Sequence, residues 1–92
     1  MYNHLIKVTA ADIKGAQSGI GLGCPIARAI NRTLNRSVLV GYKIAFLGKQ
    51  QAQLPLEICQ FIQKFDDGDI VTPINFRLEI NSIHSKFQKY CN

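Results

Sequence analysis

A chain of 92 residues has room for one domain with one core, and 47% hydrophobic with 18% charged residues excludes the composition of a disordered chain. The sequence has no apolar run near the roughly 20 residues of a membrane-spanning helix, and its first residues lack a signal-peptide pattern, so we expect a cytoplasmic protein. Residues 1–50 carry seven bases and one acid, and residues 51–92 carry four bases and five acids. The basic first half favours a partner with negative charge.

The three cysteines Cys24, Cys59 and Cys91 are far apart in the sequence, and no CxxC pair occurs. Only His4 and His84 could complete a metal site, so we expect neither a metal nor a cofactor. The simpler interpretation is two buried or half-buried thiols and one free thiol near the end of the chain. Free thiols suit a reducing compartment, which again indicates the cytosol.

The first predicted elements are a short strand over residues 5–8 and a brief helix that ends by Gly15. Alternation of apolar and polar residues indicates the strand. Thr9 followed three residues later by Asp12 is typical of a capping box, although Glu is the more usual acid.

A glycine-rich loop over residues 18–23 leads to Pro25, which is favourable in a first helical turn, and a helix is predicted over residues 25–35. Its apolar face is formed by Ile26, Ile30 and Leu34. Arg28, Arg32 and Arg36 each lie two positions further on, about 200° round the helix. The apolar and basic faces are therefore predicted to separate.

Residues 38–47 are rich in β-branched and aromatic residues, and we favour two short strands with a turn at Gly41, which could instead mark a bulge. Tyr42 and Phe46 alternate with apolar neighbours and are expected in the core. A polar loop should follow.

Helical spacing then predicts a helix over residues 55–65, and the aspartate-rich segment 66–69 should end it in a turn. Strict alternation predicts a strand over residues 74–80 with one face exposed. The tail, residues 81–92, is compatible with a terminal helix or with a frayed end.

These elements predict a single α+β domain over residues 1–92, in which one antiparallel sheet carries helices mainly on one face. The predicted order along the chain is β-α-α-β-β-α-β. The residues expected to be buried are Phe61, Ile62, Phe76 and Leu78; exposure of Phe76 and Leu78 would show a register error of one residue.

No pattern of residues indicates an enzyme. The glycine loop lacks the dinucleotide fingerprint and is followed by no Walker lysine, so a tight connection is the simpler interpretation. The aspartates at 66–69 lack the spacing of a calcium loop. The histidines lie near opposite ends of the chain, and Glu57 and Glu79 are expected on outward faces, so no triad or acid–base pair is evident.

The arginine stripe, Arg28, Arg32 and Arg36, is the candidate binding feature. Its spacing of about 6 Å per step could follow a phosphate backbone, because guanidinium groups bind phosphate in a two-pronged manner. The predicted partner-binding set is Arg28, Asn31, Arg32, Asn35, Arg36, Lys43 and Lys49. A merely solvated helix face is the alternative, but such a face usually interleaves Glu with Arg. Reversal of Arg28 and Arg32 to Glu is expected to leave the fold intact.

Several segments together resemble a widespread group of small phage-encoded proteins over residues 8–80. These segments are Thr9-Ala10-Ala11-Asp12-Ile13, Cys24-Pro25-Ile26-Ala27-Arg28-Ala29-Ile30-Asn31-Arg32, Leu54-Pro55, Phe61-Ile62, Phe65-Asp66-Asp67-Gly68 and Pro73-x-x-Phe76-x-Leu78. With this length and basic first half, the chain is similar to the eighth family of type I-F anti-CRISPR proteins. The shared motifs are structural and indicate kinship rather than mechanism.

This resemblance implies a non-enzymatic inhibitor in the host bacterial cytosol. It would bind the RNA-guided surveillance complex near its large subunit and backbone subunits, contact guide RNA and block pairing of target DNA. The alternative, from the charge alone, is a small basic nucleic-acid-binding regulator of phage or plasmid genes. Neither function requires a membrane or a small-molecule substrate.

Overall fold

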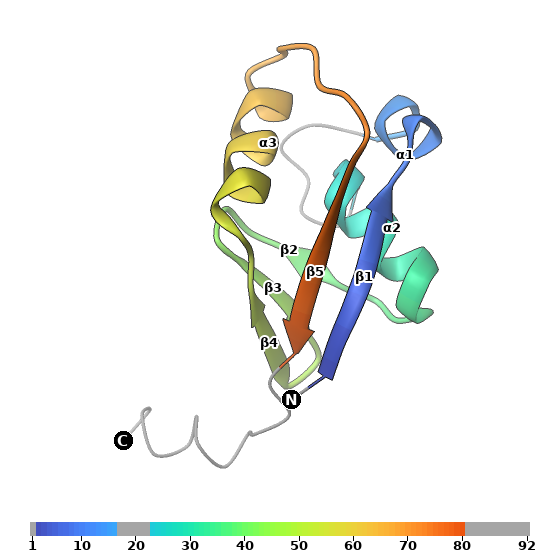
Figure 1. Ribbon diagram of the computed structural model, residues 1–92, viewed down its shortest axis with the longest axis vertical. Coiled ribbons are helices and arrows are strands. Elements are labelled where there is room, and N and C mark those ends of the chain that lie inside the picture. The colour runs from blue at the N-terminus through green and yellow to red at the C-terminus, as the bar shows by residue number, and fades with distance from the viewer. Residues whose placement is uncertain (1, 17–22, 81–92) are drawn as a thin grey trace.

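The computed structural model describes residues 2–16 and 23–80 and shows a small α+β fold with antiparallel sheets (Figure 1). Its elements, in chain order, are β1 (Tyr2–Val8), α1 (Ala10–Lys14), α2 (Pro25–Leu34), β2 (Leu39–Val40), β3 (Ile44–Leu47), β4 (Gln50–Gln53), α3 (Leu56–Asp66) and β5 (Ile74–Ile80). The α+β class with antiparallel pairing is confirmed. The predicted order was incomplete, because β4 lies where a polar loop was expected.

The strands form two sheets rather than one: a two-stranded sheet, β1-β5, and a three-stranded sheet, β2-β3-β4. The prediction of a single sheet is therefore wrong. The two sheets are neighbours through β4 and β5. One core joins them, so the chain still buries its apolar residues together.

Strand β1 pairs with β5 along their whole length, from Tyr2 opposite Ile80 to Val8 opposite Ile74. Phe76, Leu78 and Ile80 point into the core, and Asn75, Arg77 and Glu79 are exposed. The predicted register of this strand is confirmed, as is the burial of Phe61 and Ile62.

Short turns connect the strands of the second sheet. Gly41, Tyr42 and Lys43 join β2 to β3, and the Gly41 amide donates to the Ile44 carbonyl oxygen at 2.9 Å. Gly48 and Lys49 join β3 to β4. The backbone of Gly48 has φ +64°, a conformation that a residue with a Cβ adopts only at a cost.

The expectation that Tyr42 and Phe46 belong to the core is wrong, since both are exposed. Along β3 the buried positions are Ala45 and Leu47, so the alternation places Phe46 on the outer face. The inner position opposite Ala45 is Ala52 of β4. Small residues meet here, which lets the sheet pack closely on the core and leaves the larger aromatic ring outside.

Local chemistry explains where the helices begin and end. Thr9 and Asp12 form the predicted capping box of α1. Helix α2 begins with Pro25 in its first turn and with the Cys24 Sγ accepting a hydrogen bond from the Ala27 amide at 3.4 Å. It ends at Asn35, whose left-handed backbone (φ 53°) stops the helix. Burial raises the pKa of the Cys24 thiol above its ordinary value, as suits a structural cysteine.

The core lies where α2, α3 and the inner faces of both sheets meet. Its largest fully buried side chains include Ile6 of β1, Ile26 and Ile30 of α2, Leu47 of β3 and Ile58 of α3. Full burial of one such side chain contributes about 1.5–3 kcal/mol. Helix α2 packs directly on β1, which fixes the direction in which its opposite, basic face points.

The tail at residues 81–92, with His84 and Cys91, and residues 18–22 of the glycine loop lie outside the described residues. The predicted half-buried or buried state is confirmed for Cys24 and Cys59. Among the helices that the structure describes, none has the length and apolar character needed to cross a membrane.

A candidate anion-binding face on helix α2

Helix α2 separates its two faces as predicted. Ile26 and Ile30 are fully buried, and Leu34 is partly buried against the same core. Arg28 and Arg32 are exposed on the other side, and Arg36 is exposed one residue beyond the left-handed Asn35. The three guanidinium groups nevertheless differ in what they contact.

Arg32 holds together the first strand and the first helix. Its Nη1 donates to Asp12 Oδ1 in a salt bridge, and its Nη2 donates to the Lys7 carbonyl oxygen at 2.7 Å. The Asp12 side chain is almost fully buried, whereas that of Arg32 is about half exposed. Removing Arg32 would therefore leave a buried carboxylate without its cation.

Asp12 also accepts from the Thr9 amide at 2.9 Å through its Oδ2. Burial acts to raise the pKa of Asp12, but the hydrogen bond from Thr9 and the Arg32 guanidinium outweigh it, so the pKa lies below its usual value. The carboxylate is consequently charged at neutral pH, and the Arg32 guanidinium neutralises its charge.

Arg36 contacts the turn between β3 and β4. Its Nη1 donates to Gln50 Oε1 at 2.7 Å, and its Nη2 donates to the Leu47 carbonyl oxygen at 3.0 Å. The carbonyl oxygen of Arg36 in turn accepts from Asn31 Nδ2 at 2.8 Å. These bonds secure the chain just after α2 to the second sheet.

Arg28 is the uncommitted member of the stripe: within residues 2–16 and 23–80, no hydrogen bond or ion pair joins its side chain to another residue. Its guanidinium lies against Gly15 at the end of α1, where an added Cβ would come within 2.6 Å of Arg28 Nη2. A hollow of about 350 Å³ lies beside it, lined by Ala27, Arg28, Asn31, Ser37 and Val38. This hollow offers a guanidinium, an amide and a hydroxyl to an incoming anion.

The expectation that Arg28 and Arg32 can both be reversed without harm to the fold is wrong for Arg32, because a Glu there would face buried Asp12. For Arg28 the exposed environment agrees with the expectation. The partners of Arg32 and Arg36 come from segments 11 to 25 residues away in the chain, so periodicity along α2 gives no signal of them.

Asn35, Lys43 and Lys49 are exposed, but the structure does not gather all of them around α2. Lys49 follows Gly48, whose added Cβ would lie 4.0 Å from Arg36 Nη2, so it extends the basic face at that end. Lys43 lies at the other end of β3 from Lys49, and a four-residue strand separates these two ends by roughly 13 Å. Lys43 is therefore not part of the arginine stripe.

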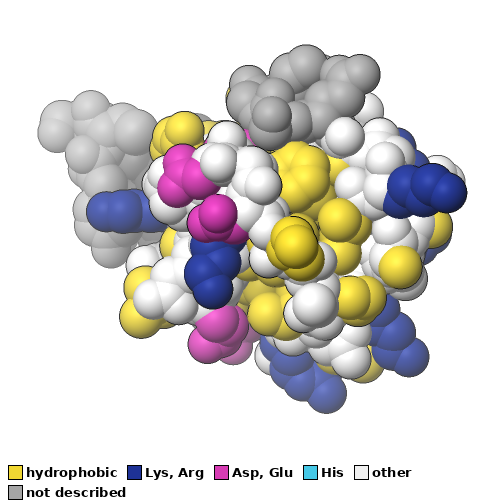
Figure 2. All heavy atoms as spheres, turned by 90° about the horizontal axis from the view of Figure 1, so that it is seen from above, with side chains coloured by type: hydrophobic (Ala, Val, Ile, Leu, Met, Phe, Trp, Pro, Cys, Tyr) yellow, Lys and Arg dark blue, Asp and Glu magenta, His cyan; other side chains and the backbone are white. Residues whose placement is uncertain are grey.

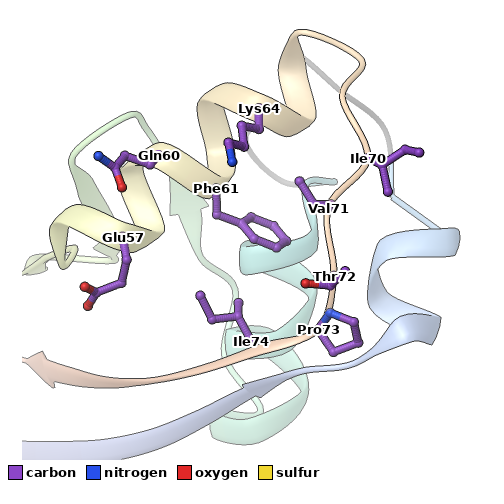
Figure 3. Close-up of a pocket in the computed structure, with 9 residues that line it drawn as sticks. All are labelled: Glu57, Gln60, Phe61, Lys64, Ile70, Val71, Thr72, Pro73 and Ile74. Carbon is purple, nitrogen blue, oxygen red and sulfur yellow. The ribbon is translucent and has the colours of Figure 1, made fainter.

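A second hollow, of about 250 Å³, lies between α3 and the segment that leads into β5 (Figure 3). The ring of Phe61 points from α3 toward Val71 and Ile74, and Glu57 and Lys64 stand on the helix side. Seen from this end of the molecule, the acidic side chains gather on one side around one Lys or Arg side chain, hydrophobic side chains lie in the middle, and most of the Lys and Arg side chains lie on the other side (Figure 2). In this view most of the Lys and Arg side chains therefore lie apart from the acidic ones.

No group of three or more His, Cys, Asp or Glu in the described part of the chain is placed to hold a metal ion. Glu57 and Glu79 are exposed, as predicted, and His4 lies in β1. The chain matched none of the protein-family models, curated proteins and solved structures with which it was compared. The fold and the charges define a small α+β domain with a basic face on α2.

Proposed function

We propose that the chain is a stoichiometric, non-enzymatic binding protein whose partner carries negative charge. The observation that carries this proposal is the distribution of charge over α2 and the second sheet. No acidic residue occurs from residue 13 to residue 56. Within the described residues Arg28, Lys43 and Lys49 are exposed, and no other side chain neutralises them.

The partner that we propose is the type I-F RNA-guided surveillance complex, in the cytosol of a bacterial host. The resemblance to an anti-CRISPR family supports this choice, and so does the basic face, which suits guide-RNA phosphates or an acidic protein surface. Binding near the large subunit and the backbone subunits would block the pairing of target DNA with the guide RNA. A regulator that binds free phage or plasmid DNA would present similar cations and is the competing function.

Titration of a purified type I-F surveillance complex tests the proposal. We expect target-DNA binding to be lost in proportion to added chain, with complete loss near a fixed molar ratio and recovery when the chain is removed. Inhibition of an excess of complex by a sub-stoichiometric dose, persisting after removal, would instead indicate catalysis. Binding to free duplex DNA, with no effect on the complex, would favour the regulator.

A further inference from the structure

The outer face of the three-stranded sheet carries exposed apolar side chains. Leu39 is 50% exposed and Phe46 is 37% exposed, and they are direct cross-strand partners. Tyr42, in the turn at one end of this face, is 60% exposed. The inner positions of the same strands, Ala45 and Leu47, are fully buried, so the exposure of Phe46 follows from the pleat.

Polar residues on this face are neutral, and the charges at its ends are positive. Gln51 lies opposite Phe46, and Gln53 lies opposite Ile44. Lys43 stands in the turn before β3 and Lys49 in the turn after it. The two lysines bracket a row of aromatic, aliphatic and amide side chains, and the segment that carries them all contains no acid.

We propose that this outer face of β2, β3 and β4 binds single-stranded nucleic acid. Bases would stack on Tyr42 and Phe46, the amides of Gln51 and Gln53 would face base edges, and Lys43 and Lys49 would meet phosphates. Some RNA-binding sheets stack two or three bases on exposed aromatic side chains in this manner. The inference rests on the proposed function and deepens it, because it names the polyanion that the chain contacts.

The two lysines favour single-stranded nucleic acid over an apolar protein surface as the partner of this face. A face that buries apolar residues against protein gains little from a lysine at each end, whereas a strand of nucleotides presents a base and a phosphate at every step. A duplex is a poorer fit, because its base faces are already stacked on one another. Lys49 follows Gly48, which lies close to Arg36 at the end of the basic face, so Tyr42 and Phe46 rather than the lysines distinguish this site from Arg28.

Fluorescence anisotropy with a labelled oligouridine of about ten nucleotides tests the proposal on the chain alone. We expect binding at low salt, and weaker binding to a duplex of the same length. Tyr42→Ala and Phe46→Ala should each raise Kd by about tenfold, as loss of one stacking platform does. Ile70→Ala is a matched control, since Ile70 is an exposed hydrophobic residue in the segment between α3 and β5, and it should leave Kd unchanged.

Tyr42 lies in a turn and is mostly exposed, so Tyr42→Ala keeps the test valid even if Phe46→Ala impairs folding. Failure of the wild-type chain to bind the oligonucleotide, or equal binding by wild type and both variants, would overturn the inference. If the aromatic variants lose only a protein partner, or only self-association measured by sedimentation, the inference is likewise wrong. Stoichiometric inhibition of the surveillance complex would survive each of these results, so the two proposals fail separately.

Discussion

The ion pair of Arg32 with Asp12 illustrates how one residue of a surface stripe can serve the fold. Asp12 is the only acid among the first 50 residues, and it is buried. Arg32 reaches it from α2 and also holds the end of β1 through the Lys7 carbonyl oxygen. Arg32 therefore serves the stability of the fold, and Arg28 is the residue of the stripe that we propose for binding.

Replacement of Arg32 by Gln should lower the free energy of unfolding by about 1.5–3 kcal/mol, because a charged hydrogen bond to buried Asp12 is lost. Arg28→Gln is the matched control on the same helix face and should change it by less than about 0.5 kcal/mol. Urea unfolding followed by circular dichroism measures both. Equal losses in the two variants would contradict the assignment.

The lowered pKa of Asp12 predicts a loss of stability in acid. A carboxylate with a lower pKa in the folded than in the unfolded state contributes stability above its unfolded pKa of about 3.9. That contribution is lost as the pH falls through the folded pKa. Urea midpoints measured from neutral pH to about pH 2 should therefore fall less steeply for Asp12→Asn than for the wild type, and an unchanged slope would show that Asp12 does not titrate in this way.

At the scale of the element, the turns of the second sheet determine which side chains face outward. Gly48 has a positive φ, and Gly41 does not. An added Cβ at Gly41 would meet the Ile44 carbonyl oxygen at an ordinary 3.5 Å. The two glycines are thus a natural pair for testing backbone conformation.

Gly48→Ala should destabilise the fold by about 1–2 kcal/mol, because an L-residue is strained in the left-handed region. Gly41→Ala should be neutral, or stabilising by a few tenths of a kcal/mol, since it restricts the unfolded chain without strain. Thermal unfolding of both variants provides the comparison. If Gly41→Ala were the more damaging, the turn conformations described here would be wrong.

The elements with strong periodicity could be predicted from the sequence, and those without it could not. Strand β5 alternates without interruption, and α2 combines Pro25 with apolar residues at helical spacing. Strand β4 reads Gln-Gln-Ala-Gln and has no apolar pattern; it forms because the turn at Gly48 returns the chain beside β3. Phe46 was placed inside because an apolar run does not reveal which of its two faces is buried.

At the scale of the whole molecule, the separation of bases from acids predicts binding that depends on salt. Arg28→Glu should weaken binding to the surveillance complex by about tenfold or more, because a charge-assisted contact becomes a repulsion. Lys64→Glu, on α3, is the control of equal charge change and should have little effect. The affinity should also fall as salt rises if phosphates are contacted. Salt-independent binding, unaffected by Arg28→Glu, would exclude the basic face as the contact surface.

Only the part of the candidate site that depends on α2 alone could be predicted from the sequence. Spacing along α2 placed the arginines on one side, and the structure agrees. The spacing could not show that the Arg32 and Arg36 side chains donate hydrogen bonds to Asp12, Gln50 and backbone carbonyl groups, because those partners depend on tertiary packing. The single acid in a basic half was the one available signal for the Arg32 pair.

The pairing of β1 with β5 has a consequence for synthesis of the chain. The first strand has its hydrogen-bonding partner only when the last described strand has left the ribosome, since Tyr2 pairs with Ile80 and Val8 with Ile74. Contacts so distant in sequence slow folding, and until they form, the apolar side chains of Ile6 and Val8 have no β5 beside them. Nascent chains that stop before residue 74 should therefore aggregate or recruit chaperones, whereas chains that extend past residue 80 should not.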